Sequence, residues 1–515
     1  MTPSSIILLQ KYRMLATIYS ITFQALCEFL TTAELVDLTR CNKIIKRTIT
    51  NTTFPIISIQ SLPQATEAIK LFPKAKFNGH LKNSILTDKD IPLLKRFISF
   101  QSFYKNNLTD TILSSLTNLS TIRLHRTPAN RLTHTSFSRL TNLTALHIFN
   151  SVHITDEDLI SLASLKILSI TGPGAINGKC LPHLINLTKL EFTYHIFDPN
   201  VRIDYLTNLE NLKISVNSFE NVKLSSGVPI CDSLLPTLIK LKTLYLDMTA
   251  PTTSISDFAL NSAVNLTDLT ISERIYPLTK QTFANATNLK SLTLYNCTIG
   301  EGSIAHLTNL KNLSVQSCSV HKEKELINLS SLSRLTLEFL SDKLKYLSSF
   351  VNLQYLEMTY VDNIYLGENL ENLSSVRTLI LKGCDGVKDN TLKNFISVDH
   401  LEISHLRIYG SSFAYLRKLT HLTINRCPIL NTNMQYLSKI TNLEIRCCPK
   451  ISDSGINYLK NLREIIIEED EPTLLTERAF RPLMFLKKIR IVAGSNITDW
   501  NNHLRSRGVM IVPKI

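Results

Sequence analysis

Histidine and cysteine are the residues of this chain whose side chains could do acid–base, nucleophilic or metal chemistry, and their spacing argues against all three. The thirteen histidines are scattered, and none forms an H-E-x-x-H zinc motif. The ten cysteines include no C-x-x-C pair, and no G-x-S-x-G turn or glycine-rich phosphate loop occurs. We therefore expect no catalytic residue, no metal site and no cofactor, and we predict that the chain is not an enzyme.

Aromatic and arginine side chains give the chain a chemistry of binding instead. Such side chains dominate the energetics of protein interfaces. Several stand at alternate positions of short apolar segments with a period of two, where the side chain should face solvent. We predict the following as partner-binding residues: Tyr245, Tyr295, Arg334 and Tyr355. The alternative for each is a purely structural role, because exposed strand positions favour tyrosine in any case.

These residues are positioned by a triplet of apolar residues, spaced L-x-x-L-x-L, that recurs seventeen times between Leu119 and Ile491. The middle residues of successive triplets are mostly 21 to 25 positions apart, which is the spacing of leucine-rich repeats. One step, from 212 to 244, is longer. It indicates an insertion around Glu220–Cys231, which we expect to emerge as a loop.

The repeat predicts the fold class directly. The last two apolar residues of each triplet alternate with polar ones, so each triplet predicts a short strand with its apolar side chains turned inward. The rest of the repeat returns the chain, and helices are predicted at 154–159 and 451–456, with Thr155 and Ser452 as N-caps. A single repeat cannot bury its apolar face alone. We therefore expect an α/β leucine-rich-repeat solenoid, a curved parallel sheet with helices on the convex side.

Five cysteines occupy one position of the repeat, three residues after the last strand residue: Cys297, Cys318, Cys384, Cys427 and Cys448. The side chain there should turn inward, where a small residue with a weak S–H donor fits. The pattern resembles the cysteine-containing class of leucine-rich repeats, which is common in F-box/leucine-rich-repeat proteins. We predict reduced core thiols rather than disulfides or metal ligands, with the adjacent side chains of Cys447 and Cys448 pointing apart.

The segment before the repeats has apolar residues at helical spacing between positions 21 and 49. Its spacing, Phe29-Leu30-x3-Glu34-Leu35-x2-Leu38-x2-Cys41, resembles an F-box, and it stands directly before the repeats as an F-box does. The resemblance implies contacts with a Skp-type adaptor protein by four apolar residues: Phe29, Leu30, Leu35 and Leu38. The alternative is that these helices only cover the open apolar end of the solenoid.

The chain is expected to divide into four segments. They are an F-box-like helical segment at 1–50, degenerate repeats at 51–118, the repeat array at 119–494 and a C-terminal cap at 495–515. The degenerate repeats contain three apolar pairs that predict strand remnants: Ile57/Ile59, Ala75/Phe77 and Phe97/Phe100. In the cap, Gly508 is expected to end a helix before a closing strand at Val509–Val512.

The composition of the chain limits which classes of partner and which cellular compartment we expect. The formal charge is +14, which permits an acidic partner, but no dense basic run or RNA-binding motif occurs, so nucleic acid is disfavoured. No run of eighteen apolar residues predicts a membrane-spanning helix. The N-terminus lacks the apolar stretch of a signal peptide, so we expect the cytoplasm, with the nucleus as the alternative.

The F-box resemblance implies a function. It is that of the substrate-recognition subunit of a Skp/cullin-type ubiquitin ligase, which holds an unidentified protein target on the concave face of the repeats. The alternative is a leucine-rich-repeat interaction scaffold with no link to ubiquitin. A GTPase activator of this fold would need a positioned loop arginine, and the sequence singles none out.

Overall fold

The computed structural model describes residues 56–512, with gaps at 83, 104–106, 127–131, 152, 194–202, 217–234, 249–255, 273–276, 321–325, 327, 341–346, 362–370, 469–473, 494–503 and 505. The F-box-like segment, with Phe29, Leu30, Leu35 and Leu38, therefore lies outside the described residues, and so does the predicted insertion. The chain divides into two compact units, Met1–Leu241 and Lys242–Ile515.

The first unit contains a parallel sheet of eight strands, each paired with the next in chain order. They are β1 (Ile56–Ile59), β2 (Lys76–His80), β3 (Phe97–Ser102), β4 (Thr121–His125), β5 (Ala145–Phe149), β6 (Ile167–Thr171), β7 (Lys189–Thr193) and β8 (Asn211–Val216). The first three confirm the predicted strand remnants, with Ile57, Phe77 and Phe97 buried. The degenerate segment is therefore a continuation of the same repeat.

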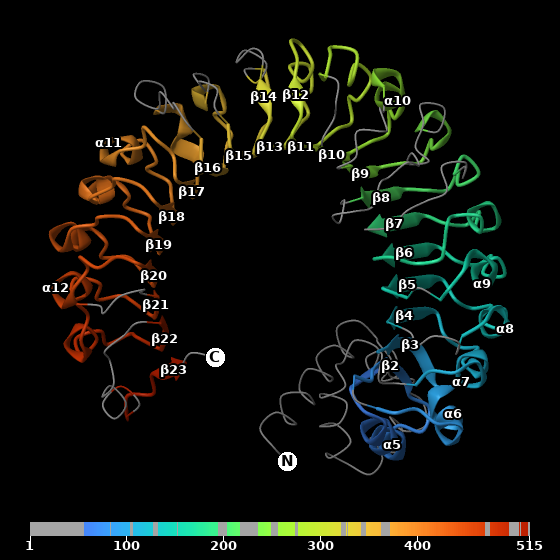
Figure 1. The fold of residues 1–515 in the computed structure, drawn as a ribbon. Coiled ribbons are helices and arrows are strands. Elements are labelled where there is room, and N and C mark those ends of the chain that lie inside the picture. The colour runs from blue at the N-terminus through green and yellow to red at the C-terminus, as the bar shows by residue number, and fades with distance from the viewer. Residues whose placement is uncertain are drawn as a thin grey trace, which may run out of the picture. The chain divides into compact units, whose positions relative to one another are not determined.

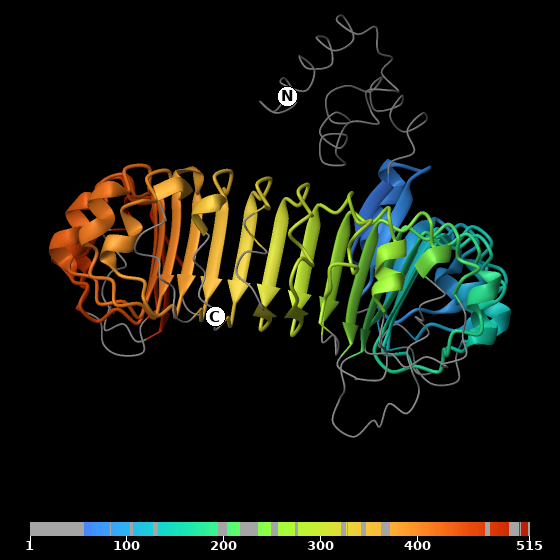
Figure 2. The same ribbon diagram turned by 90° about the horizontal axis from the view of Figure 1, so that it is seen from above.

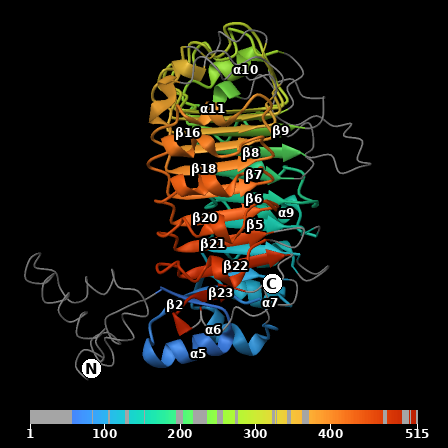
Figure 3. The same cartoon turned by 90° about the vertical axis from the view of Figure 1, so that its left-hand side faces the viewer.

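The second unit repeats this topology with thirteen parallel strands, again paired in chain order (Figure 2). They are β9 (Thr243–Met248), β10 (Asp268–Ser272), β11 (Ser291–Tyr295), β13 (Asn312–Gln316), β15 (Arg334–Glu338), β16 (Tyr355–Thr359), β17 (Thr378–Lys382), β18 (His400–Ser404), β19 (His421–Asn425), β20 (Asn442–Arg446), β21 (Glu464–Glu468), β22 (Lys488–Ala493) and β23 (Met510–Val512). A short pair, β12 (Thr298–Ile299) and β14 (Ser319–Val320), lies beside them. Figure 3 shows β16–β23 stacked in this order.

Short helices and 3₁₀ turns return the chain on the side opposite the strands (Figure 1). In the first unit they are α5 (Leu62–Leu71), η1 (Asp88–Asp90), α6 (Ile91–Leu94), α7 (Asp110–Ser115), α8 (His134–Phe137), α9 (Asp156–Leu159), η3 (Leu181–His183) and η4 (Leu235–Thr237). In the second they are α10 (Asp257–Ser262), η6 (Leu347–Ser349), η7 (Glu371–Ser375), α11 (Asp389–Leu392), η8 (Ser411–Tyr415), η9 (Asn431–Tyr436), α12 (Asp453–Ile456) and η10 (Glu477–Ala479). Helices α9 and α12 confirm the predicted starts after Thr155 and Ser452.

The core of each unit is a row of apolar side chains, and it confirms the predicted repeat. Each of the seventeen triplets supplies the second and fourth residues of one strand, from Ile122 and Leu124 in β4 to Ile489 and Ile491 in β22. In the five-residue strands these two positions are buried throughout. Burying a leucine or isoleucine side chain contributes about 1.5–3 kcal/mol, so stacking between repeats supplies the stability that one repeat lacks.

Most strands are followed directly by a residue whose backbone is left-handed. These residues are Arg126, Asn150, Gly172, Asn296, Ser317, Phe339, Tyr360, Gly383, His405, Arg426 and Cys447. Each donates its N–H to the last carbonyl of the neighbouring strand, as Tyr360 does to Lys382 at 2.7 Å. This conformation swings the following side chain inward, so Cys447 is half-buried while Cys448 is buried. The two side chains therefore point apart, as predicted.

The cysteine row is buried as expected. The thiols of Cys297, Cys318, Cys384, Cys427 and Cys448 each lie 3.1–3.3 Å from the carbonyl oxygen two residues earlier. Burial raises the pKa of Cys427 to about 11. All seven cysteines in the described part of the chain are free thiols. The predicted burial of the five cysteines of the row is confirmed.

The described part of the C-terminal cap also matches its prediction. Gly508 is left-handed, with a φ of 76°, and it leads into β23, which pairs with β22. None of the helices in the described ranges has the length and apolar character needed to span a bilayer.

Candidate binding surface

The predicted partner-binding residues all lie on the side of the strands that faces away from the core. Tyr245 is the third residue of β9, Tyr295 the fifth of β11, Arg334 the first of β15 and Tyr355 the first of β16. The structure brings only Arg334 and Tyr355 together, because β15 and β16 are neighbours. Strands β10 and β13 separate the other tyrosines from each other and from this pair.

Arg334 and Tyr355 form the best-defined contact among the four. The guanidinium carbon lies 3.5 Å from the centre of the tyrosine ring, a cation–π contact. The Tyr355 hydroxyl donates a hydrogen bond of 2.7 Å to the Glu357 carboxylate. Burial, together with this hydrogen bond, raises the pKa of Tyr355 to about 12. The phenol therefore stays protonated, and the side chain is held by Arg334 over its ring and by Glu357 at its hydroxyl.

Two aromatic residues that the sequence did not single out lie at the other end of the same two strands. Phe339 and Tyr360 directly follow β15 and β16, and their rings stack with centres 5.2 Å apart and planes 12° apart. They are exposed large side chains, at 53% and 46%. We call this pair the aromatic ledge.

The backbone of the aromatic ledge is unusual. Phe339 and Tyr360 have φ values of 50° and 49°, in the left-handed region that bulky residues rarely adopt. The other left-handed residues after the strands are not aromatic, except for the imidazole of His405. The signal available in the sequence was an aromatic residue at the position where other repeats place arginine, asparagine, serine, histidine, cysteine or glycine. The same left-handed turn follows all of these strands, so the two aromatic side chains, rather than the backbone, distinguish the ledge.

Gly383 extends the aromatic ledge along the next repeat. It occupies the same left-handed position after β17, with a φ of 58°. A Cβ atom there would lie 2.4 Å from the Tyr360 ring, so the ring rests on the glycine backbone. The Tyr360 ring can therefore occupy this position only because residue 383 has no side chain.

Ion pairs cross the sheet face of the second unit beyond the ledge. Lys382 pairs with Glu402 at 2.9 Å, and Arg446 pairs with Glu444 and Glu468 at 2.5 and 3.5 Å. All of these side chains are partly exposed, so each pair contributes at most about 1 kcal/mol. Their effect is to balance charge along these strands.

The first unit carries a stack of rings at the carboxyl ends of its strands. His125 lies between Phe103 and Phe149, with ring centres 5.1 and 4.3 Å away and nearly parallel planes. Its Nε2 atom is 2.8 Å from the Gln101 amide nitrogen, which requires a neutral, accepting imidazole. Burial, and secondly the nearby Arg123, lower the pKa of His125. His125 is thus half-buried within this stack.

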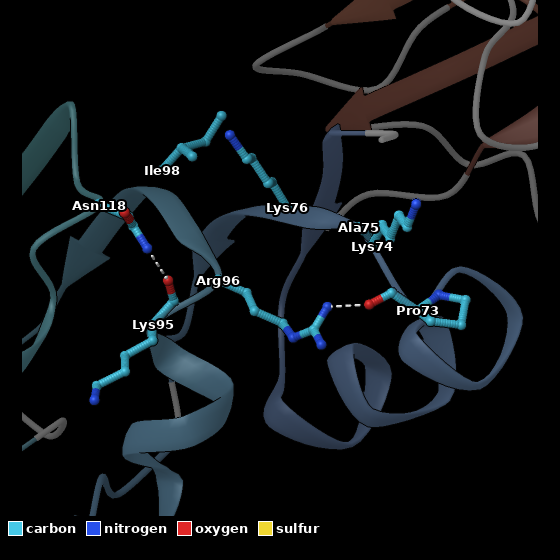
Figure 4. A pocket seen from close by; sticks show the side chains of 8 residues that line it. All are labelled: Pro73, Lys74, Ala75, Lys76, Lys95, Arg96, Ile98 and Asn118. Atoms are coloured by element: carbon cyan, nitrogen blue, oxygen red, sulfur yellow. Dashed lines mark hydrogen bonds between the residues drawn. The ribbon is translucent and has the colours of Figure 1, made fainter. Parts of the chain in front are cut away.

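A cavity of about 340 Å³ opens where β2, β3 and β4 begin (Figure 4). Its lining residues are Pro73, Lys74, Ala75, Lys76, Lys95, Arg96, Ile98 and Asn118. Arg96 donates to the carbonyl oxygen of Pro73, and the Asn118 amide donates to that of Lys95 at 2.9 Å. Four of the eight lining residues are cationic and none is acidic. We call this cavity the basic pocket.

Metal chemistry has no candidate in the ranges that the structure covers. No group of three or more His, Cys, Asp or Glu side chains is arranged there to hold an ion.

This geometry defines a class of protein, the leucine-rich-repeat solenoids, which work as binding scaffolds. Residues 215–332, 253–376 and 385–504 match the model of the BspA-type leucine-rich repeat region, over more than half of the chain. The chain belongs to this family. A comparison with curated proteins finds no match.

Solved structures share the fold at low identity. A chain of the mouse RP105/MD-1 complex is 17% identical over 88% of this chain and 83% of that chain, with a TM-score of 0.54. An internalin from Listeria monocytogenes is 22% identical over 61% and 82%, with a TM-score of 0.38. A leucine-rich-repeat protein of Leptospira interrogans is 17% identical over 84% and 99%, with a TM-score of 0.44. At these identities the similarity concerns the fold alone.

Proposed function

We propose that this protein binds a protein partner on the sheet face of its repeats and carries out no reaction of its own. The observation that supports the proposal most is the aromatic ledge, Phe339 and Tyr360. Two large rings are held exposed on neighbouring repeats, where their apolar surface gains nothing from burial, so their placement needs a reason other than stability. Capture of a partner's side chains on their faces is such a reason.

The neighbouring strands suit the centre of an interface. Arg334 and Tyr355 lie on β15 and β16, whose last residues directly precede Phe339 and Tyr360. Aromatic and arginine residues supply most of the energy in a protein interface, and their surroundings mainly exclude water. We expect Tyr245 to contribute less, because β10, β11 and β13 separate its strand from β15. Tyr295 ends β11, which is two strands from β15.

The finer proposal rests on the spacing of residues 21–49 alone. We propose that they dock a Skp-type adaptor through Phe29, Leu30, Leu35 and Leu38, which makes the chain the substrate-recognition subunit of a ubiquitin ligase in the cytoplasm, or in the nucleus. The alternative proposal is an interaction scaffold in which these residues cap the solenoid.

The role of the sheet face is tested by capture of proteins from cells with matched variants. The double variant Phe339→Ser, Tyr360→Ser should lose a set of proteins that the intact chain retains. The control is Tyr415→Ser, Tyr436→Ser, which removes two similarly exposed rings from the return segments η8 and η9. Equal losses in both variants, measured by quantitative mass spectrometry, would contradict a partner site at the ledge.

The adaptor proposal is tested separately with a purified Skp-type adaptor. The intact chain should bind it, and Leu35→Asp, Leu38→Asp should not, with folding checked by circular dichroism. A chain that fails to bind the adaptor while the sheet-face experiment succeeds is an interaction scaffold.

A further inference from the structure

The basic pocket lies in the first unit and has no part in the sheet-face proposal. We propose that it binds a phosphomonoester group carried on a protein side chain. The argument rests on one anchored arginine, three lysines around it, the apolar floor of the cavity and its volume.

Arg96 is the anchored cation of the pocket. Its side chain is only partly exposed, and one guanidinium nitrogen donates to the carbonyl oxygen of Pro73, as Figure 4 shows. That hydrogen bond fixes the planar group at the cavity wall. A guanidinium has five N–H donors in a rigid fork that matches the oxygens of a phosphate. Holding the fork in advance lowers the entropy cost of binding.

The three lysines favour a ligand with a high negative charge. Lys76 begins β2, Lys74 lies just before it, and Lys95 adjoins Arg96, so three lysine side chains line the same cavity as Arg96. Figure 4 shows their ammonium groups spread around Arg96 and directed away from one another. A phosphomonoester carries about −1.5 to −2 charges at pH 7 and offers three strong acceptor oxygens. A carboxylate carries one charge and two oxygens, so four cations favour the phosphoryl group.

Carboxylates near the pocket in sequence are engaged elsewhere. Glu67 pairs with Lys70 at 2.5 Å, and Asp90 accepts hydrogen bonds from the backbone and hydroxyl of Thr87 at 2.9 and 2.8 Å. Neither of them lines the cavity. The lining of the pocket therefore contains no carboxylate.

The volume and the floor indicate that the phosphoryl group arrives on a larger side chain. About 340 Å³ falls at the lower end of ligand pockets, which span about 300–1,000 Å³. Pro73, Ala75 and Ile98 supply an apolar surface between the cations. The amide of Asn118 closes one side, because its hydrogen bond to the Lys95 carbonyl ties two repeats together. A phosphorylated side chain would pack its carbon atoms on this floor.

The test uses the full chain and three probes at matched ionic strength: capped phosphotyrosine, capped phosphoserine and inorganic phosphate. Calorimetry should show saturable binding of at least one capped amino acid, tighter than that of inorganic phosphate, and at least tenfold weaker in Arg96→Gln, Lys76→Gln. The control Lys89→Gln, Lys179→Gln removes two cations outside the pocket and should change nothing. Arg96→Lys keeps the charge and loses the fork, so partial weakening there supports the assigned geometry.

Three outcomes would overturn the proposal. One is the absence of saturation for every probe. Another is equally weakened binding in the control variant Lys89→Gln, Lys179→Gln, which would show that the net charge of the protein alone attracts the probes. The third is binding of inorganic phosphate as tight as that of both capped amino acids, which would assign free phosphate as the ligand. Unfolding temperatures of the variants are compared with that of the intact chain, and Arg96→Lys replaces Arg96→Gln if the latter fails to fold.

Discussion

At the scale of single residues, the contact between Tyr360 and Gly383 shows how the surface depends on one missing side chain. Gly383→Ala should lower the free energy of unfolding by about 1–3 kcal/mol, because alanine is disfavoured in the left-handed region and its Cβ would overlap the Tyr360 ring. The matched control is Gly508→Ala, which has a φ of 76° but no atom within 4 Å of the added Cβ. Urea unfolding measures both.

The two glycine variants separate backbone strain from steric overlap. Gly508→Ala should lower the free energy of unfolding only by the strain of an alanine in a left-handed backbone conformation. Adding Tyr360→Ser should restore part of the stability of Gly383→Ala and none of that of Gly508→Ala. Equal losses in the two single variants would mean that the ring moves aside freely.

His125 gives a prediction about acid. Burial and Arg123 lower its pKa in the folded protein, so the unfolded chain binds more protons as the pH falls through about 6.5. The stability that His125 contributes is therefore present above that pH and is lost below it. His125→Phe should keep the ring stack and make the free energy of unfolding fall less steeply between pH 7 and 5. Part of the pH dependence of the free energy of unfolding should remain in this variant, because the pKa of His147 is also lowered.

At the scale of elements, aspartate side chains join some return segments to the next. The buried carboxylate of Asp156 accepts from the backbone N–H groups of Asn177, Gly178 and Cys180 at 2.7, 2.9 and 2.8 Å. Asp389 does the same for Tyr409 and Gly410. These bonds replace the intrahelical partners that such short helices cannot supply.

Asp156→Ala should therefore destabilise the protein by about 2–4 kcal/mol, since it leaves three N–H groups without their acceptor. The neighbouring exposed residue Glu157 is the control, and Glu157→Ala should cost less than about 0.5 kcal/mol. Chemical denaturation compares the two. A loss of under 1 kcal/mol for Asp156→Ala would show that water replaces the carboxylate.

The strands, the inward cysteines and the helix starts at Thr155 and Ser452 could be predicted, because each follows from a periodic pattern with one structural solution. The aromatic ledge could not, since Phe339 and Tyr360 stand outside the alternating strand positions and their exposure depends on the left-handed turn. The basic pocket also escaped prediction. Its cations come from two separate stretches, 74–76 and 95–96, that only the pairing of β2 with β3 brings together.

At the scale of the whole molecule, buried thiols report on the integrity of the repeats. Cys297, Cys318, Cys384 and Cys448 are 2–5% exposed, whereas Cys447 is half-buried. A thiolate is the reactive species, and burial disfavours it. We expect a maleimide to label Cys447 first under native conditions and the other four only when their repeats unfold. Peptide mass spectrometry after timed labelling measures this, and early labelling of Cys384 would contradict the buried row.

The unbroken register from β9 to β20 has a consequence for how such a surface can change in evolution. Duplicating or deleting one whole repeat shifts all later side chains by one strand spacing, about 4.8 Å, and leaves every inward residue inward. Unequal recombination within the gene can thus move Tyr295 closer to or further from the aromatic ledge in discrete steps. Distances between recognition residues become a heritable variable that point mutation alone could not adjust.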